Sequence, residues 1–139
     1  MSYAIAGSGL DALSLVNEEK ALTAARMFEK ESKNELEEAV MRTYAALGDF
    51  QEFSYFEKRL QTASNYDLYI TAAYFSEYLK NQNLNTAAKG AQLIIEASKN
   101  GPPWANYYFN IMVERLVEHQ LGNYENKKEV RQKFAEALK

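Results

Sequence analysis

Apolar residues recur at helical spacing along almost the whole of this 139-residue chain, and this pattern limits the fold more than any other feature. A clear example is the series Leu36, Val40, Tyr44 and Leu47. The alternation typical of strands is scarce. Proline occurs only at Pro102 and Pro103, directly after Gly101, where one helix should end and the next begin. The sequence therefore predicts an all-α fold.

Helix start signals and short polar connections divide the chain into about eight predicted helices. Asn17, Asn34 and Asn126 each stand where an asparagine side chain can cap the first turn of a helix. Because the connections are short, consecutive helices should pack as antiparallel hairpins. The predicted helices span residues 3–15, 18–31, 35–47, 50–62, 66–81, 84–98, 103–121 and 127–139.

A similar tripeptide closes the first helix of each predicted hairpin. These tripeptides are LVN, LGD, LKN and LGN, and they begin at Leu15, Leu47, Leu79 and Leu121. Repeated hairpins that cannot bury their faces alone indicate a right-handed α-solenoid of about four antiparallel hairpins. Irregular turns favour the HEAT-like or armadillo-like type, whereas the run YAALGDFQEFSYFEKRL fits a tetratricopeptide-like alternative. Leu47 should pack against the neighbouring hairpin.

Residues 1–139 are predicted to form a single helical-repeat domain. The apolar pattern begins almost at once, at Tyr3 and Ile5, and the last helical pattern runs to Lys139 without a stop signal. We therefore expect the domain to come from the C-terminal part of a larger protein.

Composition excludes several classes of function. The chain has no cysteine, so it forms no disulfide and no thiolate metal site. Sixteen Lys and Arg residues against nineteen Asp and Glu residues give no basic surface for a nucleic acid. No apolar run approaches the roughly 20 residues that span a bilayer, so no membrane partner is predicted. The sequence does not indicate a cellular compartment.

The search for catalytic chemistry gives no candidate residue. With one histidine, His119, the chain cannot form a His-Glu-x-x-His zinc motif, and it has no phosphate-binding glycine loop. Glu114, Glu118 and His119 share one predicted helix, but a surface histidine explains them better than a metal site. Ser8, between two glycines, has no strand before it and no histidine partner, and close helix packing explains the glycines better. No catalytic, cofactor-binding or metal-binding residue is predicted, and an independent enzyme is disfavoured.

Aromatic residues are abundant, with ten Tyr, seven Phe and one Trp. Most should fill space between helix layers. A ring with a polar tip also suits a partly hydrated contact surface, so a face that binds another polypeptide is plausible. Its predicted members are Tyr66, Tyr69, Tyr107 and Tyr108.

Several runs together resemble the C-terminal helical domain of M1-family zinc aminopeptidases, in the bacterial branch where that domain is a short HEAT-like solenoid. These runs are SYAIAGSGLDAL, the stretch from EKAL to FEKES, YAALGDF, and the helix Y-x-x-Y-I-x-A-A-Y. The resemblance covers nearly the whole chain and rests on the pattern of repeated helices, not on a catalytic motif.

The resemblance implies a non-catalytic role. In that family a separate domain holds the zinc ion, and the helical domain closes the active-site chamber and limits the access of peptides. The implied partner is the catalytic domain of the same polypeptide, with peptide substrates met only indirectly and zinc only in that other domain. No motif assigns a substrate-binding role to Arg42, Arg59 or Arg115. The alternative is a stand-alone helical-repeat module for protein–protein interaction.

Overall fold

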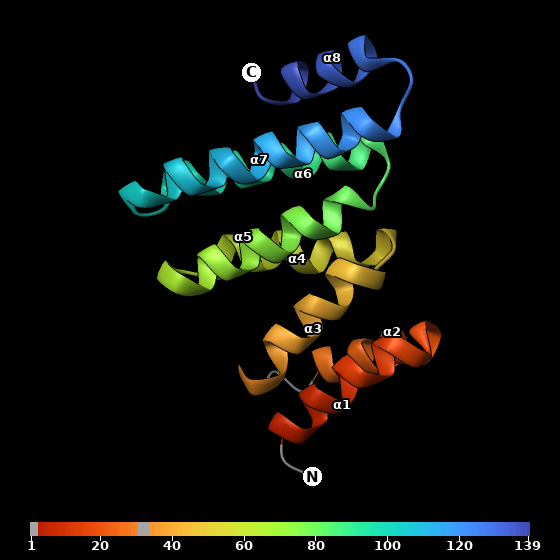
Figure 1. The fold of residues 1–139 in the computed structure, drawn as a ribbon. Coiled ribbons are helices and arrows are strands. Elements are labelled where there is room, and N and C mark those ends of the chain that lie inside the picture. Colours follow the sequence, from red (N-terminus) through yellow and green to blue (C-terminus); the bar gives the residue numbers. More distant parts are fainter. Residues whose placement is uncertain (1–2, 31–33) are drawn as a thin grey trace. The chain divides into compact units, whose positions relative to one another are not determined.

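The structure is a computed structural model that describes residues 3–30 and 34–139, with side chains described for residues 9–30 and 36–139. The described residues form eight α-helices and one short 3₁₀ turn, and they contain no β-strand. The all-α prediction is therefore confirmed. The elements are α1 (Tyr3–Val16), α2 (Glu18–Glu29), α3 (Asn34–Leu47), η1 (Phe50–Glu52), α4 (Phe53–Thr62), α5 (Asn65–Lys80), α6 (Leu84–Asn100), α7 (Pro103–Asn123) and α8 (Lys127–Ala137) (Figure 1).

Asparagine side chains cap the first turns of helices at two of the positions predicted from the sequence. The side chain of Asn17 accepts a hydrogen bond from the backbone N–H of Lys20, and Asn126 accepts one from Glu129. The cap predicted at Asn34 lies outside the described side chains. Asn83, which the sequence reading did not single out, caps α6 in the same way. No helix in the described part of the chain is long and apolar enough to cross a membrane.

The chain divides into two compact units, residues 1–52 and residues 53–139. In the first unit, α1, α2 and α3 each pack against the other two. Leu10 and Tyr44 are fully buried there, and α2 contributes the buried side chains of Ala21 and Ala25. Leu47, which was expected to pack against a neighbouring hairpin, is only partly buried at the last residue of α3. The prediction of one domain over residues 1–139 stays a prediction.

A polar cluster joins α2 to the end of the first unit. Glu52 is a charged residue with a side chain only 3% exposed. Arg26 donates to it from Nε at 2.7 Å, and the backbone N–H of Asp49 donates at 2.8 Å. Arg26 also donates to the Asp49 carboxylate at 3.1 Å. A buried carboxylate needs such donors because burial removes its hydration.

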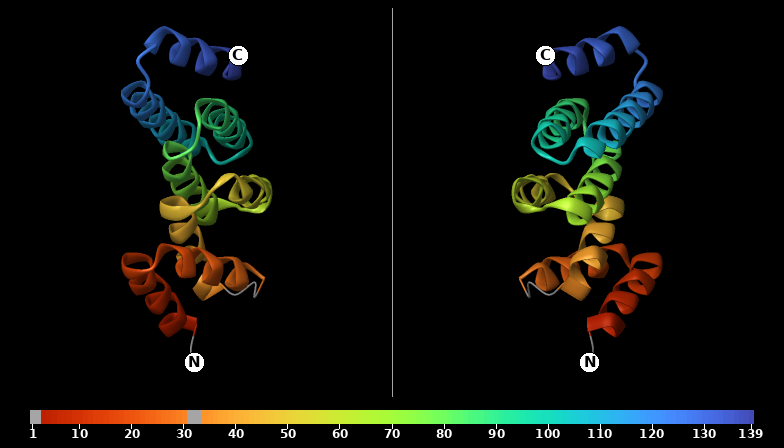
Figure 2. Two further views of the ribbon diagram at one scale, coloured as in Figure 1. Left: turned by 90° about the vertical axis from the view of Figure 1, so that its right-hand side faces the viewer. Right: turned by 90° about the vertical axis from the view of Figure 1, so that its left-hand side faces the viewer.

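In the second unit each helix packs against the next, and also against the next but one. The consecutive pairs are α4 with α5, α5 with α6, α6 with α7, and α7 with α8. The alternate pairs are α4 with α6, α5 with α7, and α6 with α8 (Figures 1 and 2). An aromatic core holds α4 to α5: the ring of Phe56 lies 5.3 Å from that of Phe75 and 5.2 Å from that of Tyr78. These three side chains are fully buried.

Two residues determine how closely the helices of this unit approach one another. Gly90 of α6 faces Leu79 of α5, and a methyl group at Gly90 would overlap the Leu79 side chain. Gln120 of α7 is fully buried, and its amide nitrogen donates to the carbonyl oxygens of Leu79 and Gln82, each at 3.1 Å. These carbonyls lie where α5 ends and its regular backbone pairing stops, although Leu79 O also accepts from the backbone N–H of Gln82 at 3.2 Å. Gln120 therefore ties α7 to the end of α5.

Candidate interaction surface

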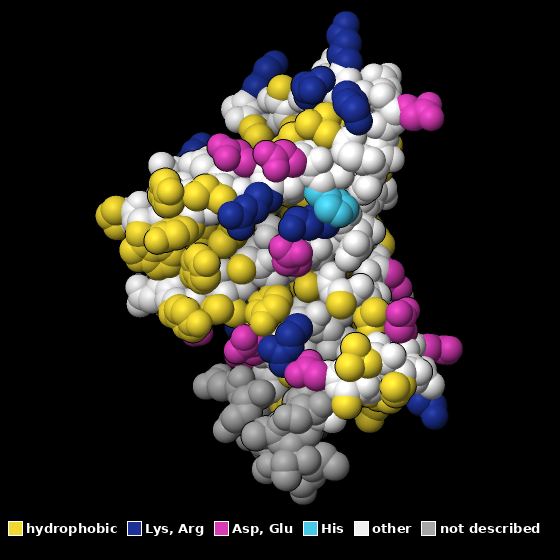
Figure 3. Space-filling view, viewed as in Figure 1, with side chains coloured by type: hydrophobic (Ala, Val, Ile, Leu, Met, Phe, Trp, Pro, Cys, Tyr) yellow, Lys and Arg dark blue, Asp and Glu magenta, His cyan; other side chains and the backbone are white. Residues whose placement is uncertain are grey.

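Five aromatic side chains gather at the N-terminal ends of α5 and α7. We call them the aromatic patch, and they are Tyr66, Tyr69, Trp104, Tyr107 and Tyr108. Figure 3 shows hydrophobic side chains concentrated over this part of the second unit, with basic side chains beside them. Both helices begin at the patch and run in the same direction away from it (Figure 1).

Local sequence signals place both helix starts at the patch. Asn65, the first residue of α5, has a φ of 54°, a left-handed conformation that asparagine tolerates better than most residues. Pro103 stands at the first position of α7, where its missing N–H is not needed for the helix. The four-residue spacing between Trp104 and Tyr108 then places these two rings on one face of α7.

The rings of the patch contact one another. Tyr69 is at the centre, with its ring 5.8 Å from that of Tyr108, 6.2 Å from that of Trp104 and 6.5 Å from that of Tyr66. Tyr107 joins through Tyr108, at 5.2 Å. Most of these pairs are edge-to-face, an arrangement that is favourable for aromatic rings. The structure thus brings together all four tyrosines predicted as a contact face.

The patch is open to solvent. Tyr66 is 70% exposed and Tyr107 is 66% exposed, while Trp104 and Tyr108 are also exposed and Tyr69 is half-buried. A contiguous exposed apolar surface commonly marks an interaction site. Sequence reasoning did not select Trp104, although its position in the run WANYYF and its spacing from Tyr108 could have indicated it.

A groove leads away from the patch between α5 and α7, and we call it the α5–α7 groove. Its volume is about 440 Å³, and Tyr69 and Tyr108 stand at its aromatic end. Ala73, Ile111 and Met112, all half-buried, provide apolar surface along it. The groove is therefore continuous with the aromatic patch through the residues that the two share.

The other end of the α5–α7 groove is charged. Lys80 and Glu77 lie on the α5 side and pair with each other at 2.8 Å. Arg115 lies on the α7 side and is exposed. Among the residues that the structure describes, Arg115 makes no hydrogen bond and no ion pair. This end of the groove consequently carries an arginine that forms no ion pair with another described residue.

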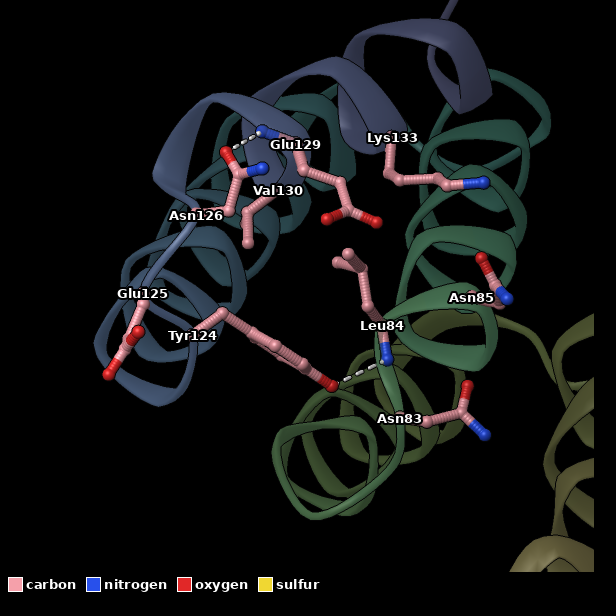
Figure 4. Close-up of a pocket in the computed structure, with 9 residues that line it drawn as sticks. All are labelled: Asn83, Leu84, Asn85, Tyr124, Glu125, Asn126, Glu129, Val130 and Lys133. Carbon is pink, nitrogen blue, oxygen red and sulfur yellow. Dashed lines mark hydrogen bonds between the residues drawn. The ribbon is translucent and has the colours of Figure 1, made fainter.

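A second cavity, of about 380 Å³, lies where the start of α6 meets α8 (Figure 4). The Tyr124 hydroxyl accepts a hydrogen bond from the backbone N–H of Leu84 at 3.0 Å, and the Asn126 side chain caps α8. Glu129 and Lys133 of α8 also line it, beside the apolar Val130. The Tyr124 hydroxyl and the Asn126 side chain thus hold helix ends in place. We interpret this cavity as a gap where helices pack, with a structural role.

The described residues contain no group of three or more His, Asp and Glu side chains that could hold a metal ion. His119 and its neighbours Glu114 and Glu118 are exposed, and the contact of His119 is with the Asn123 amide at 3.4 Å. The Ser8 side chain lies outside the described side chains. A methyl group at Gly9 would meet no atom of the described side chains within 4 Å, so packing against these does not explain that glycine, contrary to expectation.

Comparison with protein-family models, with curated proteins and with solved structures gives no significant match for this chain.

Proposed function

We propose that this chain is a non-catalytic helical-repeat module that contacts another polypeptide through the aromatic patch. Following the sequence resemblance, we propose that this polypeptide is the catalytic domain of an M1-family zinc aminopeptidase within the same protein. In that arrangement the helices close the active-site chamber and limit which peptides enter. The observation that carries the polypeptide contact is the continuous cluster of five largely exposed rings, each in contact with at least one other.

The chemistry of the patch suits a protein partner. Tyrosine and tryptophan are enriched in the cores of protein–protein interfaces, because they offer a large apolar area together with one polar group. They also lose little conformational freedom on binding, since their side chains have few rotatable bonds. Rings that already contact one another lose even less. The patch is therefore a preorganised anchor of the kind that dominates binding free energies.

The solenoid arrangement is part of the same proposal. Contacts of α4 with α6, α5 with α7 and α6 with α8 are those expected when successive hairpins stack in one direction. We extend this stacking to the whole chain as a right-handed HEAT-like or armadillo-like solenoid of about four hairpins, with a tetratricopeptide-like solenoid as the alternative. Small-angle X-ray scattering would test it, because a stacked array has a larger radius of gyration than a globular chain of this length.

A stand-alone interaction module is the second candidate, and the α5–α7 groove is the observation that favours it. A groove with aromatic and apolar walls can accept a short peptide without any catalytic domain. Under this proposal the patch and groove together form the binding site, and the partner is a separate protein.

The first test is to sequence the genomic reading frame upstream of Ser2. The aminopeptidase proposal expects an in-frame His-Glu-x-x-His motif with a second glutamate some turns later. A protein that contains this motif should be assayed with peptides of increasing length, with and without residues 1–139. We expect the deletion to relax the preference for short peptides. A stop codon directly upstream, with no such motif in frame, would contradict the proposal.

The patch itself is tested by paired substitutions in the intact protein. Tyr66→Ala together with Tyr107→Ala removes two exposed rings and should weaken the contact at least tenfold, as expected for interface anchors. Phe50→Ala is the matched control, because Phe50 is 73% exposed and lies outside the patch. If the double variant and Phe50→Ala weaken the contact equally, or if neither weakens it, the patch is not the contact surface.

A further inference from the structure

We infer that the α5–α7 groove binds an extended segment that carries an apolar or aromatic side chain at one end and an acidic side chain at the other. This inference rests on the proposed polypeptide contact and adds the chemical class of the partner segment. It follows from three properties of the groove: its direction, its length and its charge.

The direction comes from the parallel course of α5 and α7. Tyr69 and Tyr108 mark the aromatic end, near the start of both helices. Lys80 and Arg115 mark the charged end, further along each helix. The two ends of the groove therefore differ in chemistry, one aromatic and the other charged. A bound segment consequently has a preferred orientation.

The length follows from helix geometry. Tyr108 and Arg115 stand seven positions apart in α7, which corresponds to roughly 10 Å along the helix axis. An extended chain advances about 3.3 Å per residue, so roughly three residue steps span that distance. The apolar and acidic side chains of the segment should consequently be separated by about three positions.

The charge determines which side chain the second position prefers. Glu77 neutralises Lys80 by direct pairing at 2.8 Å, so Lys80 offers little attraction to a ligand. Arg115 has no such partner among the described residues, and its planar guanidinium suits a carboxylate. An acidic side chain at this end therefore gains a charge partner, whereas a basic one meets repulsion from Arg115.

Three synthetic probes test the inference on the intact 139-residue chain. Each is an N-acetylated, C-amidated peptide with phenylalanine followed by two alanines and a final residue, which is glutamate, glutamine or lysine. The blocked termini exclude attraction to a free carboxylate. Titration followed by amide chemical shifts in NMR should give dissociation constants on the order of 1 mM for the glutamate peptide. We expect the lysine peptide to bind about three- to fivefold more weakly, as an exposed charge pair permits.

Charge reversal of the protein supplies the decisive comparison. Arg115→Glu should abolish or invert the preference for glutamate over lysine, while leaving the glutamine peptide unaffected. Arg131→Glu is the matched control, because Arg131 is an exposed arginine of α8 that lines neither the groove nor the patch. It should leave all three affinities unchanged. Circular dichroism spectra would confirm that both variants remain helical.

The outcomes separate failure of this inference from failure of the proposed function. If all three peptides bind equally, and Tyr108→Ala weakens them alike, the patch binds polypeptide but the acidic preference is wrong. If no peptide shifts the amides of Tyr69, Tyr108 or Arg115 at several millimolar, the inference is overturned, while the contact with a folded partner is still tested by the Tyr66 and Tyr107 substitutions. A dimer that Tyr107→Ala dissociates in sedimentation would show that a second copy of the chain occupies the surface, which also overturns the inference.

Discussion

At the scale of single residues, the first unit depends on one buried carboxylate and its donors. Glu52 is almost completely buried, and Arg26 is its charged partner. The hydrogen bonds from Arg26 hold the pKa of its own guanidinium above the usual range. Loss of this partner would leave a buried carboxylate with one backbone donor, and that is more costly than loss of an exposed ion pair.

We predict that Arg26→Ala lowers the free energy of unfolding by about 2 kcal/mol, since the partly exposed arginine reduces the cost expected for a fully buried pair. Arg42→Ala is the control. Its pair with Asp11 is exposed on both sides, so the loss should stay below about 1 kcal/mol. Urea denaturation followed by circular dichroism measures both values. Equal losses would mean that burial of Glu52 does not matter.

The same cluster makes stability depend on pH through Asp49. The N–H of Gln51 donates to its carboxylate at 2.8 Å and, with Arg26, holds the pKa of Asp49 below the ordinary value of 3.8. The ionised form therefore stabilises the folded state fully above pH 3.8, and this contribution disappears as the pH falls through the lower folded-state pKa.

We predict that the wild-type chain loses more stability between about pH 5 and pH 2.5 than Asp49→Asn does, because the amide does not titrate. Urea melts at a series of pH values would measure the difference. Parallel curves for the two proteins would show that Asp49 has the same pKa in the folded and unfolded chain. Arg26 contributes no change in this range, since its raised pKa lies far above it.

At the scale of the helices, sequence periodicity located the elements more reliably than the faces that they bury. In α5 Ile70, Ala73 and Tyr74 stand at helical spacing, but the structure leaves them only half-buried. Its buried face instead includes Phe75 and Leu79. α5 carries apolar residues on every side, so several stripes fit a helical period equally well. Two residues of the stripe that the core does not use, Ala73 and Tyr74, line the α5–α7 groove.

Close approach of α5 and α6 gives a prediction at this scale. Gly90→Ala places a methyl group against Leu79 in a filled core, and overpacking of this kind typically costs about 1–3 kcal/mol. Gly122→Ala is the matched control in α7, where the new methyl group meets open space. It should be neutral or stabilise by up to about 1 kcal/mol, because alanine favours helix more than glycine does. Thermal melts would compare the two, and equal effects would contradict the packing.

At the scale of the whole molecule, the second unit contains a complete core of its own. Phe56, Phe75, Phe109 and Leu116 are fully buried, and each lies within residues 53–139. Gln120 and Tyr124 make their hydrogen bonds within the same range. A unit whose buried side chains find their partners internally should not need the rest of the chain to fold.

We therefore predict that a fragment of residues 53–139 is helical and unfolds cooperatively in isolation. Far-UV circular dichroism and thermal denaturation would measure this. The same fragment with Phe75→Ala should be destabilised by about 3–5 kcal/mol, since the ring is at the centre of the core. A fragment without helical signal would show instead that residues 1–52 are required for the second unit to fold.

The sequence by itself determined the helical class, the approximate helix boundaries and the identity of four tyrosines in the patch. These depend on local chemistry: apolar spacing, asparagine caps at Asn17 and Asn126, and the adjacent prolines before α7. Tertiary structure decided which residues that are distant in the sequence lie side by side, because local chemistry does not determine this. Because α5 and α7 run in parallel, rings some forty residues apart in sequence contact one another, Trp104 joins them, and Arg115 lies at the far end of a shared groove. Such long-range positions depend on which apolar stripe of each helix the core buries, and that choice is made only when the helices pack.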